Sequence, residues 1–453
     1  MARKIFISFL GMGNLTKVNP YDPVKYYYKD KENATNDETI FVQSAELELY
    51  PNINSFDKFI LLATNSSSQN ITTLKEEIAS KGIVIDEKKF DTTIDDISDE
   101  LTNPDAAWEW FGRLQAKIET NDEIVWDVTH GFRIVPIVFS AAIGYLKRAK
   151  NITLTSVLYG AYVPPKQGEE KKESYPIVDV RDFYTITDWA EGVGRLVDNA
   201  DTGFLLKVAE KEKSGSFVEL NNKDLLENIA KLTKSVRNVE LQNIETNAKI
   251  ALDAIQQSII SAQSLEKQIL MMIVDKFTPL ISEAPINGQY TKDYLSLQVR
   301  LIDLLATHGL YMQCFTAMRE WLGSLGLAIL EEHNHSSRKN DDKARRYAEV
   351  FVNMLQYPER DWKFDSIMEL KPMKDKLYPA YCSLKKLSNF TQVIELLIKM
   401  KNVRDGFDHG WTGKHIAGVP ENIHEIFSNA KAIFQSIIEN WDDIIAQKNN
   451  KSC

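Results

Sequence analysis

The chain has 453 residues, of which 43% are hydrophobic and 26% charged, and its formal net charge is −10 at pH 7. These values are typical of an ordinary soluble globular protein of two or three domains. The acidic balance argues against a generally basic nucleic-acid-binding surface, although a local basic cleft stays compatible with it. Three cysteines lie far apart without C-x-x-C spacing, which indicates neither a disulfide framework nor a zinc site and fits a reducing cytoplasm.

The N-terminal residues MARKIFISFLGMG are interpreted as a first β-strand. They lack the longer apolar region and the small-residue cleavage site of a signal peptide. The longest apolar run, IVPIVFSAAIGYL, has 13 residues and is too short to span a bilayer. We therefore expect a cytoplasmic protein with no membrane partner.

Residues 1–185 alternate short apolar runs with helical patterns. The apolar runs are rich in Ile, Val, Phe and Thr, as strands are, and lie at 4–11, 57–68, 81–90, 122–131, 151–162 and 175–183. Helical patterns between them cover 42–50, 70–82 and 131–150. This alternation predicts a Rossmann-like α/β domain with a parallel-rich sheet and helices on both faces. The stretch PPKQGEEKKES, 164–174, is expected to be an exposed hairpin tip or loop.

Residues 186–453 lose the strand pattern and form a second predicted domain, which is all-α. Apolar residues recur at three- and four-residue spacing, as Val393, Leu396, Leu397 and Met400 do. The predicted helical stretches lie at 186–212, 222–282 with few breaks, 293–332, 341–356, 388–405 and 420–446.

Three predicted strands end in small and polar residues, namely GMGNLTK, ATNSSS and DVTHGFR. Ligands of open α/β sheets bind beyond the carboxyl ends of the strands, where small residues allow close approach and hydroxyls and amides supply hydrogen bonds. Pro136 is tolerated only in a first helical turn, so a helix N-terminus should follow Gly131 and form an anion site with Arg133. The candidate ligand-binding residues are Gly11, Gly13, Asn14, Thr64, Asn65, Ser66, Asp127, Thr129, His130, Gly131 and Arg133.

Known nucleotide fingerprints do not explain this cluster. Gly11 and Gly13 lack the third glycine of G-x-G-x-x-G, because position 16 is Thr, and no phosphate-binding G-x-x-x-x-G-K-[ST] is present. A structural alternative exists for each residue alone: Asp127 caps a turn, His130 bonds a carbonyl and Arg133 pairs with an acid. The gathering of such groups at three strand ends favours ligand binding for the cluster as a whole.

The stretch DVTHGFR resembles the D-x-T-H-G-F-R signature of CRISPR-associated proteins of type III systems. FISFLGMGN, TIFVQSAELEL and YPIVDVRDFYTITDWAEGVGRLVDNADTG are similar to the surroundings of that signature, so the resemblance covers roughly the first 205 residues. Such proteins join an N-terminal Rossmann-like CARF sensor domain to a helical C-terminal HEPN domain. The resemblance implies these domains at 1–185 and 186–453.

The resemblance also implies a ligand, a cyclic oligoadenylate, with cyclic tetra-adenylate the usual one for this branch. A ring of this kind has two-fold symmetry, which a homodimer would match by binding it across its axis. Arg133 and the helix N-terminus would suit the phosphates, whereas Thr64, Asn65 and Ser66 would suit ribose or base edges.

The stretch RDGFDH near the C-terminus places Arg404 and His409 five positions apart. Two structural alternatives are open: Arg404 pairs with Asp408 at i,i+4, and His409 is a solvated residue of the last turn. The stretch also fits the HEPN ribonuclease motif, with Asp405 in the polar position that follows the Arg. Asn is common at that position in related nucleases, and Asp405 brings a negative charge close to a phosphate.

The resemblance implies an endoribonuclease that cleaves single-stranded RNA. The chemistry needs no metal or other cofactor, because the RNA 2′-OH is the nucleophile, His409 moves a proton and Arg404 stabilises phosphoryl charge. The products would be a 2′,3′-cyclic phosphate and a 5′-hydroxyl. One Arg and one His per chain give a thin site, and the resemblance implies that two copies facing each other across a dimer axis complete it, in a homodimer or a higher oligomer.

Two other functions stay open at this point. The α/β domain could itself degrade its cyclic ligand with the help of His130 or Thr129. A non-catalytic, nucleotide-sensing regulator is disfavoured because no basic recognition helix stands out. A metal site at His333 and His335 is not expected, since an i,i+2 pair does not share a helix face and nothing completes the ligand set.

Overall fold

The computed structural model of this chain describes residues 2–14, 19–51, 55–86, 88–94, 104–130, 135–168, 170–212, 217–282, 290–330, 338–364, 369–412 and 418–448. The chain divides into two compact units, Met1–Thr187 and Asp188–Cys453, called unit 1 and unit 2 below. The sequence places the corresponding boundary after residue 185.

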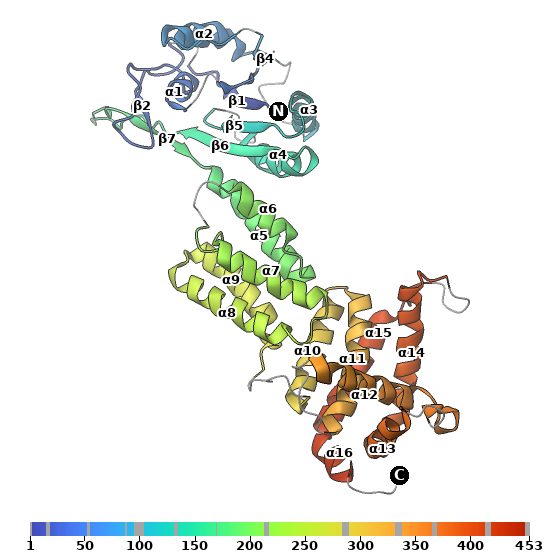
Figure 1. The fold of residues 1–453 in the computed structure, drawn as a ribbon. Helices are drawn as coiled ribbons and strands as arrows, with labels where there is room; N and C mark the ends of the chain where they lie inside the picture. The colour runs from blue at the N-terminus through green and yellow to red at the C-terminus, as the bar shows by residue number, and fades with distance from the viewer. Residues whose placement is uncertain are drawn as a thin grey trace. The chain divides into compact units, whose positions relative to one another are not determined.

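Unit 1 is a seven-stranded sheet flanked by helices (Figure 1). Its elements are β1 Lys4–Leu10, β2 Tyr26–Tyr28, α1 Val42–Leu49, β3 Lys58–Ala63, η2 Ser68–Asn70, α2 Ile71–Ser80, β4 Phe90–Ile94, α3 Pro104–Lys117, β5 Glu123–Asp127, α4 Val135–Ala149, β6 Thr153–Gly160, β7 Tyr175–Asp179 and the start of α5 Arg181–Asn199. The strand order is β2-β7-β6-β5-β1-β3-β4. All neighbouring pairs are parallel except β6 with β7.

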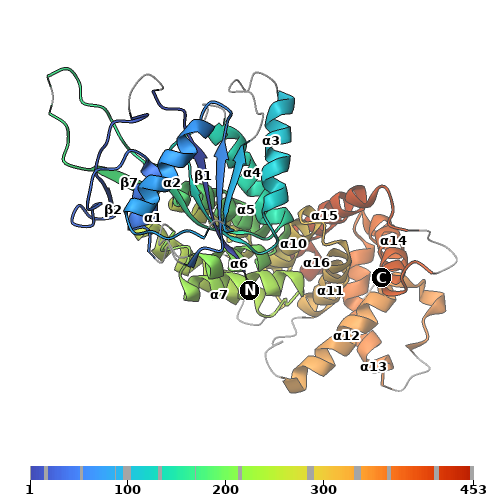
Figure 2. The same cartoon turned by 90° about the horizontal axis from the view of Figure 1, so that it is seen from above.

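Both faces of this sheet are buried, which explains the continuous apolar composition of its central strand. In β1, Ile5, Ile7 and Phe9 join a core cluster with α3 and α4, whereas Phe6 and Leu10 join another cluster with α1 and α2. Figure 2 shows the two helix pairs on opposite sides of the strands. Successive side chains of β1 point to opposite faces of the sheet, so this one strand contributes to the core clusters on both faces.

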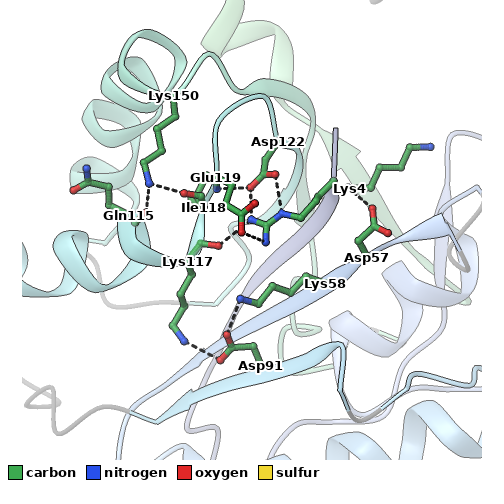
Figure 3. A network of polar contacts seen from close by, with 11 residues as sticks. Lys4, Asp57, Lys58, Asp91, Gln115, Lys117, Ile118, Glu119, Asp122 and Lys150 are labelled. Carbon is green, nitrogen blue, oxygen red and sulfur yellow. Dashed lines mark hydrogen bonds and ion pairs between the residues drawn. The ribbon is translucent and has the colours of Figure 1, made fainter. Parts of the chain in front are cut away.

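The amino ends of the strands are joined by a charged network (Figure 3). Arg3 donates to both carboxylate oxygens of Asp122, at 3.0 and 2.8 Å. Asp91 pairs with Lys58 at 2.9 Å and with Lys117 at 2.8 Å. Burial acts to raise the pKa of Asp91, but the hydrogen bonds from Lys117 and Lys58 prevail and lower it. These ion pairs hold β1, β3, β4 and the entry to β5 together at one edge.

Unit 2 is helical throughout its described residues (Figure 1). Its elements are the remainder of α5, then α6 Gly203–Lys211, α7 Lys223–Arg237, α8 Ile244–Ser261, α9 Ser264–Phe277, η3 Thr278–Leu280, α10 Lys292–Thr307, α11 Tyr311–Ile329, α12 Arg338–Gln356, η4 Glu359–Asp361, α13 Lys371–Lys385, α14 Phe390–Asp408, α15 Ile423–Glu439 and α16 Trp441–Lys448.

Helix α11 forms the centre of unit 2. Its Trp321 is fully buried, stacks on Phe434 of α15 with ring centroids 3.9 Å apart, and donates its indole N–H to the Leu295 carbonyl of α10 at 3.0 Å. A satisfied indole allows this large ring to fill the core without a desolvation penalty. The contact joins α10, α11 and α15 into one packed layer.

The predicted fold class is confirmed: an α/β unit with a parallel-rich sheet precedes an all-α unit. The loop 164–174 connects the antiparallel strands β6 and β7, and its described residues are mostly exposed, as expected.

Several predicted elements were wrong or missing. The strand predicted at 81–90 begins only at Phe90, because Gly82 turns the chain with a φ of +73° and Ile83 and Ile85 pack on the core outside any strand. The three-residue β2 was not predicted. Nor was α13, which contains Pro379 in its interior. The stretch 222–282 is helical with few breaks, as predicted, and divides into α7, α8, α9 and η3. Cys382 is disulfide-bonded, contrary to the expectation of reduced cysteines.

Candidate functional site

The carboxyl ends of β1, β3 and β5 lie at neighbouring positions in the sheet of unit 1. After β1 the chain forms β2 at the far edge beside β7, then places β3 and β4 on one side of β1 and β5 and β6 on the other. The strand order therefore reverses between β1 and β5, which is where open α/β sheets bind their ligands. The three polar segments predicted from sequence follow these three strands.

The segment after β1 depends on two glycines. A Cβ at Gly11 would overlap the Tyr21 hydroxyl, and a Cβ at Gly13 would overlap the Pro20 carbonyl. Gly13 also has a φ of +63°, which residues with a side chain adopt only rarely. The Asn14 N–H donates to the Pro20 carbonyl at 2.7 Å and closes the loop. These small residues thus serve tight packing of the loop that covers the strand end.

The segment after β3 is a turn held by its own hydroxyls. The Thr64 N–H donates to Ser67 Oγ at 2.9 Å, and the Ser67 N–H donates to Thr64 Oγ1 at 3.2 Å. Thr64 is buried, Asn65 is exposed and Ser66 is half-buried. The Thr64 hydroxyl is therefore engaged within the turn, whereas Asn65 and Ser66 present more surface to a ligand.

Asp127 lies at the end of β5 and is fully buried. Its carboxylate accepts hydrogen bonds from Ser8 Oγ at 2.7 Å, from Gln43 Nε2 at 3.3 Å and from the Thr129 N–H at 2.8 Å. Thr129 Oγ1 in turn accepts the Gly160 N–H at 2.7 Å. Asp127 and Thr129 therefore fix the backbone that leaves β5, a role closer to the turn-capping alternative than to direct ligand contact.

The half-buried His130 stacks on Tyr21, with ring centroids 4.6 Å apart and the ring planes at 26°. Burial lowers the pKa of His130, and the negative charge of Asp127 opposes that shift. The imidazole is therefore neutral at pH 7. Burial raises the pKa of Tyr21 to about 12, which keeps its hydroxyl protonated.

Sequence reasoning missed four residues of this corner: Ser8, Tyr21, Gln43 and Asn70. Asn70 Nδ2 donates to the carbonyls of Gly11 and Met12, at 3.2 and 3.0 Å, and so ties the β1 loop to the start of α2. Ser8 and Gln43 lie in FISFLGMGN and TIFVQSAELEL, stretches that the resemblance covers but that do not single out these side chains, and no motif marks Tyr21 or Asn70. Gly131 and Arg133 lie outside the described residues; α4 begins at Val135 with Pro136 in its first turn, as predicted.

Arg404, Asp405 and His409 lie at the C-terminal end of α14, which ends at Asp408. Arg404 Nη2 donates to Asp405 Oδ1 at 2.8 Å, and Arg404 Nε lies 3.4 Å from Asp408 Oδ2. His409 is exposed at the helix cap. The i,i+4 ion pair of the structural alternative is therefore present, and the guanidinium has two carboxylates beside it.

Gly406 allows a compact end to α14. A Cβ at this position would overlap the ring of Trp411, which folds back on the helix with a φ of +61° and contacts Phe407 at a centroid distance of 5.0 Å. Phe407 also contacts Phe315 of α11. The last turn of α14 is thus anchored to the unit 2 core, while Arg404 and His409 keep access to solvent.

In the part of the chain that the structure describes, no three His, Cys, Asp or Glu residues are grouped as metal ligands would be. No helix in that part is long and apolar enough to cross a membrane. His333 and His335 lie outside it.

Comparisons with known proteins place these sites in context. No family model matches the chain. A curated protein of Methanocaldococcus jannaschii, the CRISPR-associated protein MJ1674, is 23% identical over 221 residues, which cover 48% of this chain. The chain is similar to a CRISPR-associated protein. The matched residues span only 28% of that relative's length.

A solved structure of Enterococcus italicus Csm6, bound to cyclic hexa-2′-fluoro-hexa-dAMP, aligns over 100% of this chain and 96% of its own. The TM-score is 0.42 and the sequence identity is 12%. A score this low carries no argument about function.

Proposed function

We propose that this protein is a cyclic-oligoadenylate-activated, metal-independent endoribonuclease of type III CRISPR defence. One observation carries the proposal: the D-x-T-H stretch lies at the carboxyl end of β5, beside the point where strand order reverses, and leads toward α4. A ligand site of an open α/β sheet belongs at that position. The similarity to a CRISPR-associated protein supports the biological setting.

The ligand would bind at the three strand ends of unit 1. Asn65 and Ser66 offer polar groups, the neutral His130 ring offers a hydrogen bond or a stacking face, and the start of α4 with Arg133 would attract phosphates. Gly11 and Gly13 let the β1 loop approach closely. Cyclic tetra-adenylate is the expected ring, and a two-fold homodimer would match its symmetry.

RNA cleavage would take place at the end of α14. Five residues along a helix correspond to roughly 140° around its axis, so a single chain does not stack Arg404 and His409 on one helix face. A second copy facing the first across a dimer axis would bring an Arg and a His together at one phosphate. His409 would then accept the 2′-OH proton or donate to the leaving 5′-oxygen, while Arg404 stabilises the phosphoryl charge.

Activation has an energetic condition at Arg404. Its present partners, Asp405 and Asp408, must yield to the substrate phosphate, since a guanidinium held by two carboxylates offers little net positive charge. These pairs are partly exposed, and ion pairs at a protein surface contribute only about 0–1 kcal/mol, so a phosphate can replace them. We propose that ligand binding in unit 1 regulates unit 2 by releasing Arg404 from these two carboxylates.

A second function is favoured by one observation, the neutral and half-buried His130 at the ligand site. A neutral imidazole can accept a proton from a ribose 2′-OH, so unit 1 could cleave its own cyclic ligand. That activity would switch the nuclease off with time.

The test incubates purified protein with labelled single-stranded RNA in EDTA, with and without cyclic tetra-adenylate or hexa-adenylate. His409→Ala is compared with His424→Ala, because His424 is an exposed histidine of unit 2 bonded to Tyr311. We expect ligand-dependent cleavage in the wild type and the His424 variant, and a loss of about 10²–10⁴-fold in His409→Ala.

RNA that survives every activator, or equal cleavage by His409→Ala, would refute the nuclease. Ligand that disappears in the wild type but persists with His130→Ala supports the second function. If the protein binds the cyclic ligand but cleaves neither RNA nor the ligand, it is a non-catalytic regulator.

A further inference from the structure

Glu46 of α1 carries a carboxyl group that is buried and receives no hydrogen bond from an N–H or hydroxyl donor of the described residues. The residue is only 1% exposed. Gln43, three residues earlier, also leaves its amide oxygen without a partner. A buried ionised carboxylate in such surroundings would be very costly, whereas a neutral acid is tolerated.

The neighbouring carboxyl group belongs to Asp127 and has the opposite surroundings. Two N–H groups and one hydroxyl donate to it, from Gln43, Thr129 and Ser8. Donors stabilise the charged form of a carboxyl group, and three of them converge on Asp127 while none reaches Glu46. The surroundings thus divide the pair into one carboxylate and one acid.

The pKa of Glu46 agrees with this division. Burial raises the pKa of Glu46 well above its usual value, and the negative charge of Asp127 and a side-chain hydrogen bond with Asp127 raise it further. Two carboxyl groups that share one buried site cannot both ionise at neutral pH.

We propose that Glu46 and Asp127 share a single proton, carried by Glu46, and that this acid pair positions the end of β5. Asp127 bonds the Thr129 N–H directly, so the pair sets the path of the backbone that carries His130. Glu46 is in this sense a positioning residue. Its effect on ligand binding rests on the proposed function, whereas the shared proton itself does not.

The other titratable groups around the pair leave a clear window of pH. Tyr26 comes from β2, Tyr175 from β7 and His130 from the segment after β5. Tyr21 lies in the segment before β2, and Tyr162 in the segment between β6 and β7. The pKa values of Tyr21, Tyr26 and Tyr162 are raised by burial, and that of His130 is lowered. Above pH 7, His130 is already neutral, and tyrosines ordinarily titrate near pH 10.

The proton makes stability depend on pH in a defined direction. The unfolded chain releases the Glu46 proton near its ordinary pKa of about 4.3, whereas the folded chain keeps it to a higher pH. Unfolding is therefore favoured progressively as pH rises between the ordinary and the raised pKa. Glu46→Gln keeps the size and a donor but cannot ionise, so it should remove this loss.

The first experiment records infrared spectra and thermal unfolding of the full chain at pH 5, 7 and 9. The matched control is Glu76→Gln, which removes an exposed carboxylate on α2. We expect a protonated-carboxyl band in the wild type and in Glu76→Gln at pH 7 that is missing in Glu46→Gln. The melting temperature of Glu46→Gln, relative to the wild type, should increase from pH 5 to pH 9. The shared proton is refuted if the band persists in Glu46→Gln. It is also refuted if the difference in melting temperature between Glu46→Gln and the wild type does not vary with pH.

The second experiment measures the affinities for cyclic tetra-adenylate and cyclic hexa-adenylate at pH 7 and 9. Wild-type binding should weaken as Glu46 ionises, by up to about tenfold per pH unit, while Glu46→Gln binds almost equally at both values. Equal pH profiles of wild type and Glu46→Gln refute the positioning role. If the wild type binds no cyclic oligoadenylate at any pH, the proposed function fails, and the infrared band still decides the shared proton.

Discussion

The strand ends of unit 1 and the helix end of unit 2 differ in how completely one chain builds them. At the strand ends, Asp127, Thr129 and Thr64 each have hydrogen-bond partners inside the unit, and Tyr21 covers His130. At the end of α14, His409 is exposed, and the ion-pair partners of Arg404 among the described residues are the acids of its own helix, Asp405 and Asp408.

This difference suggests different roles for the two regions. A site whose groups are already fixed binds with little loss of conformational freedom, as a receptor for a small ligand should. In the proposed function, a site with one solvated histidine and one arginine held by two carboxylates is completed by a second copy before it reacts. In the proposed function, that completion is what the ligand controls.

Arg404→Lys is expected to give the largest effect, because it should change RNA cleavage at the end of α14 without changing ligand binding at the strand ends of unit 1. Lysine keeps the positive charge but loses the planar fork that bonds two phosphoryl oxygens, so RNA cleavage should fall by about 10²–10³-fold. Affinity for cyclic tetra-adenylate, measured by calorimetry, should not change. The control is Arg345→Lys, an exposed i,i+4 partner of Glu349 on α12. Full activity of Arg404→Lys would remove the helix end from the mechanism.

Asp127→Asn tests the internal bonding of the strand ends. An amide at this position turns one acceptor into a donor, so at least one of the Ser8, Gln43 and Thr129 donors loses its partner. We expect a loss of about 1–3 kcal/mol in the free energy of unfolding, measured by urea denaturation, and weaker ligand binding. The exposed Asp37→Asn should have little effect. Unchanged stability would mean that Asp127 is not the anchor of β5.

Gly406→Ala tests the packing of the helix end in the same way. The new Cβ would overlap the Trp411 ring, and we expect a loss of about 1–3 kcal/mol in unfolding free energy together with weaker RNA cleavage. Gly194→Ala in α5 is the control, because its Cβ would meet nothing within 4 Å. It should be neutral or stabilising by up to about 1 kcal/mol. Equal stability of the two variants would show that Trp411 does not anchor the turn.

The smallest effect is expected on acidification from pH 7.5 to 5.5. The pKa of His130 is lowered in the folded chain, so the unfolded chain binds the proton more readily and stability is lost as pH falls below about 6.5. Burial lowers the pKa of His308 in unit 2 to about 4, which acts in the same direction. Urea midpoints should fall less in His130→Gln than in the wild type, and His424→Gln serves as the exposed control. An identical fall in His130→Gln would contradict the buried, neutral imidazole.

Much of the fold could be predicted because local periodicity reports which faces are buried. The short apolar run KIFISFL predicted the central strand β1, and the spacing of Val393, Leu396, Leu397 and Met400 predicted α14, where all four are buried. Elements that depend on distant partners were not visible in this way. The strand β2 has only three residues and exists through its pairing with β7, and α13 contains a proline that normally argues against a helix.

For the candidate sites, the sequence by itself determined which residue types follow each strand and where RDGFDH lies along the chain. These features could be predicted because the residues near a strand end or a helix end themselves indicate where the element stops. Only the tertiary structure decided that Tyr21 covers His130, that Trp411 packs on Gly406 and that Glu46 lies buried beside Asp127. Those pairs join separate elements or depend on backbone turns, and burial and proximity, which set their protonation and packing, exist only once the chain has folded.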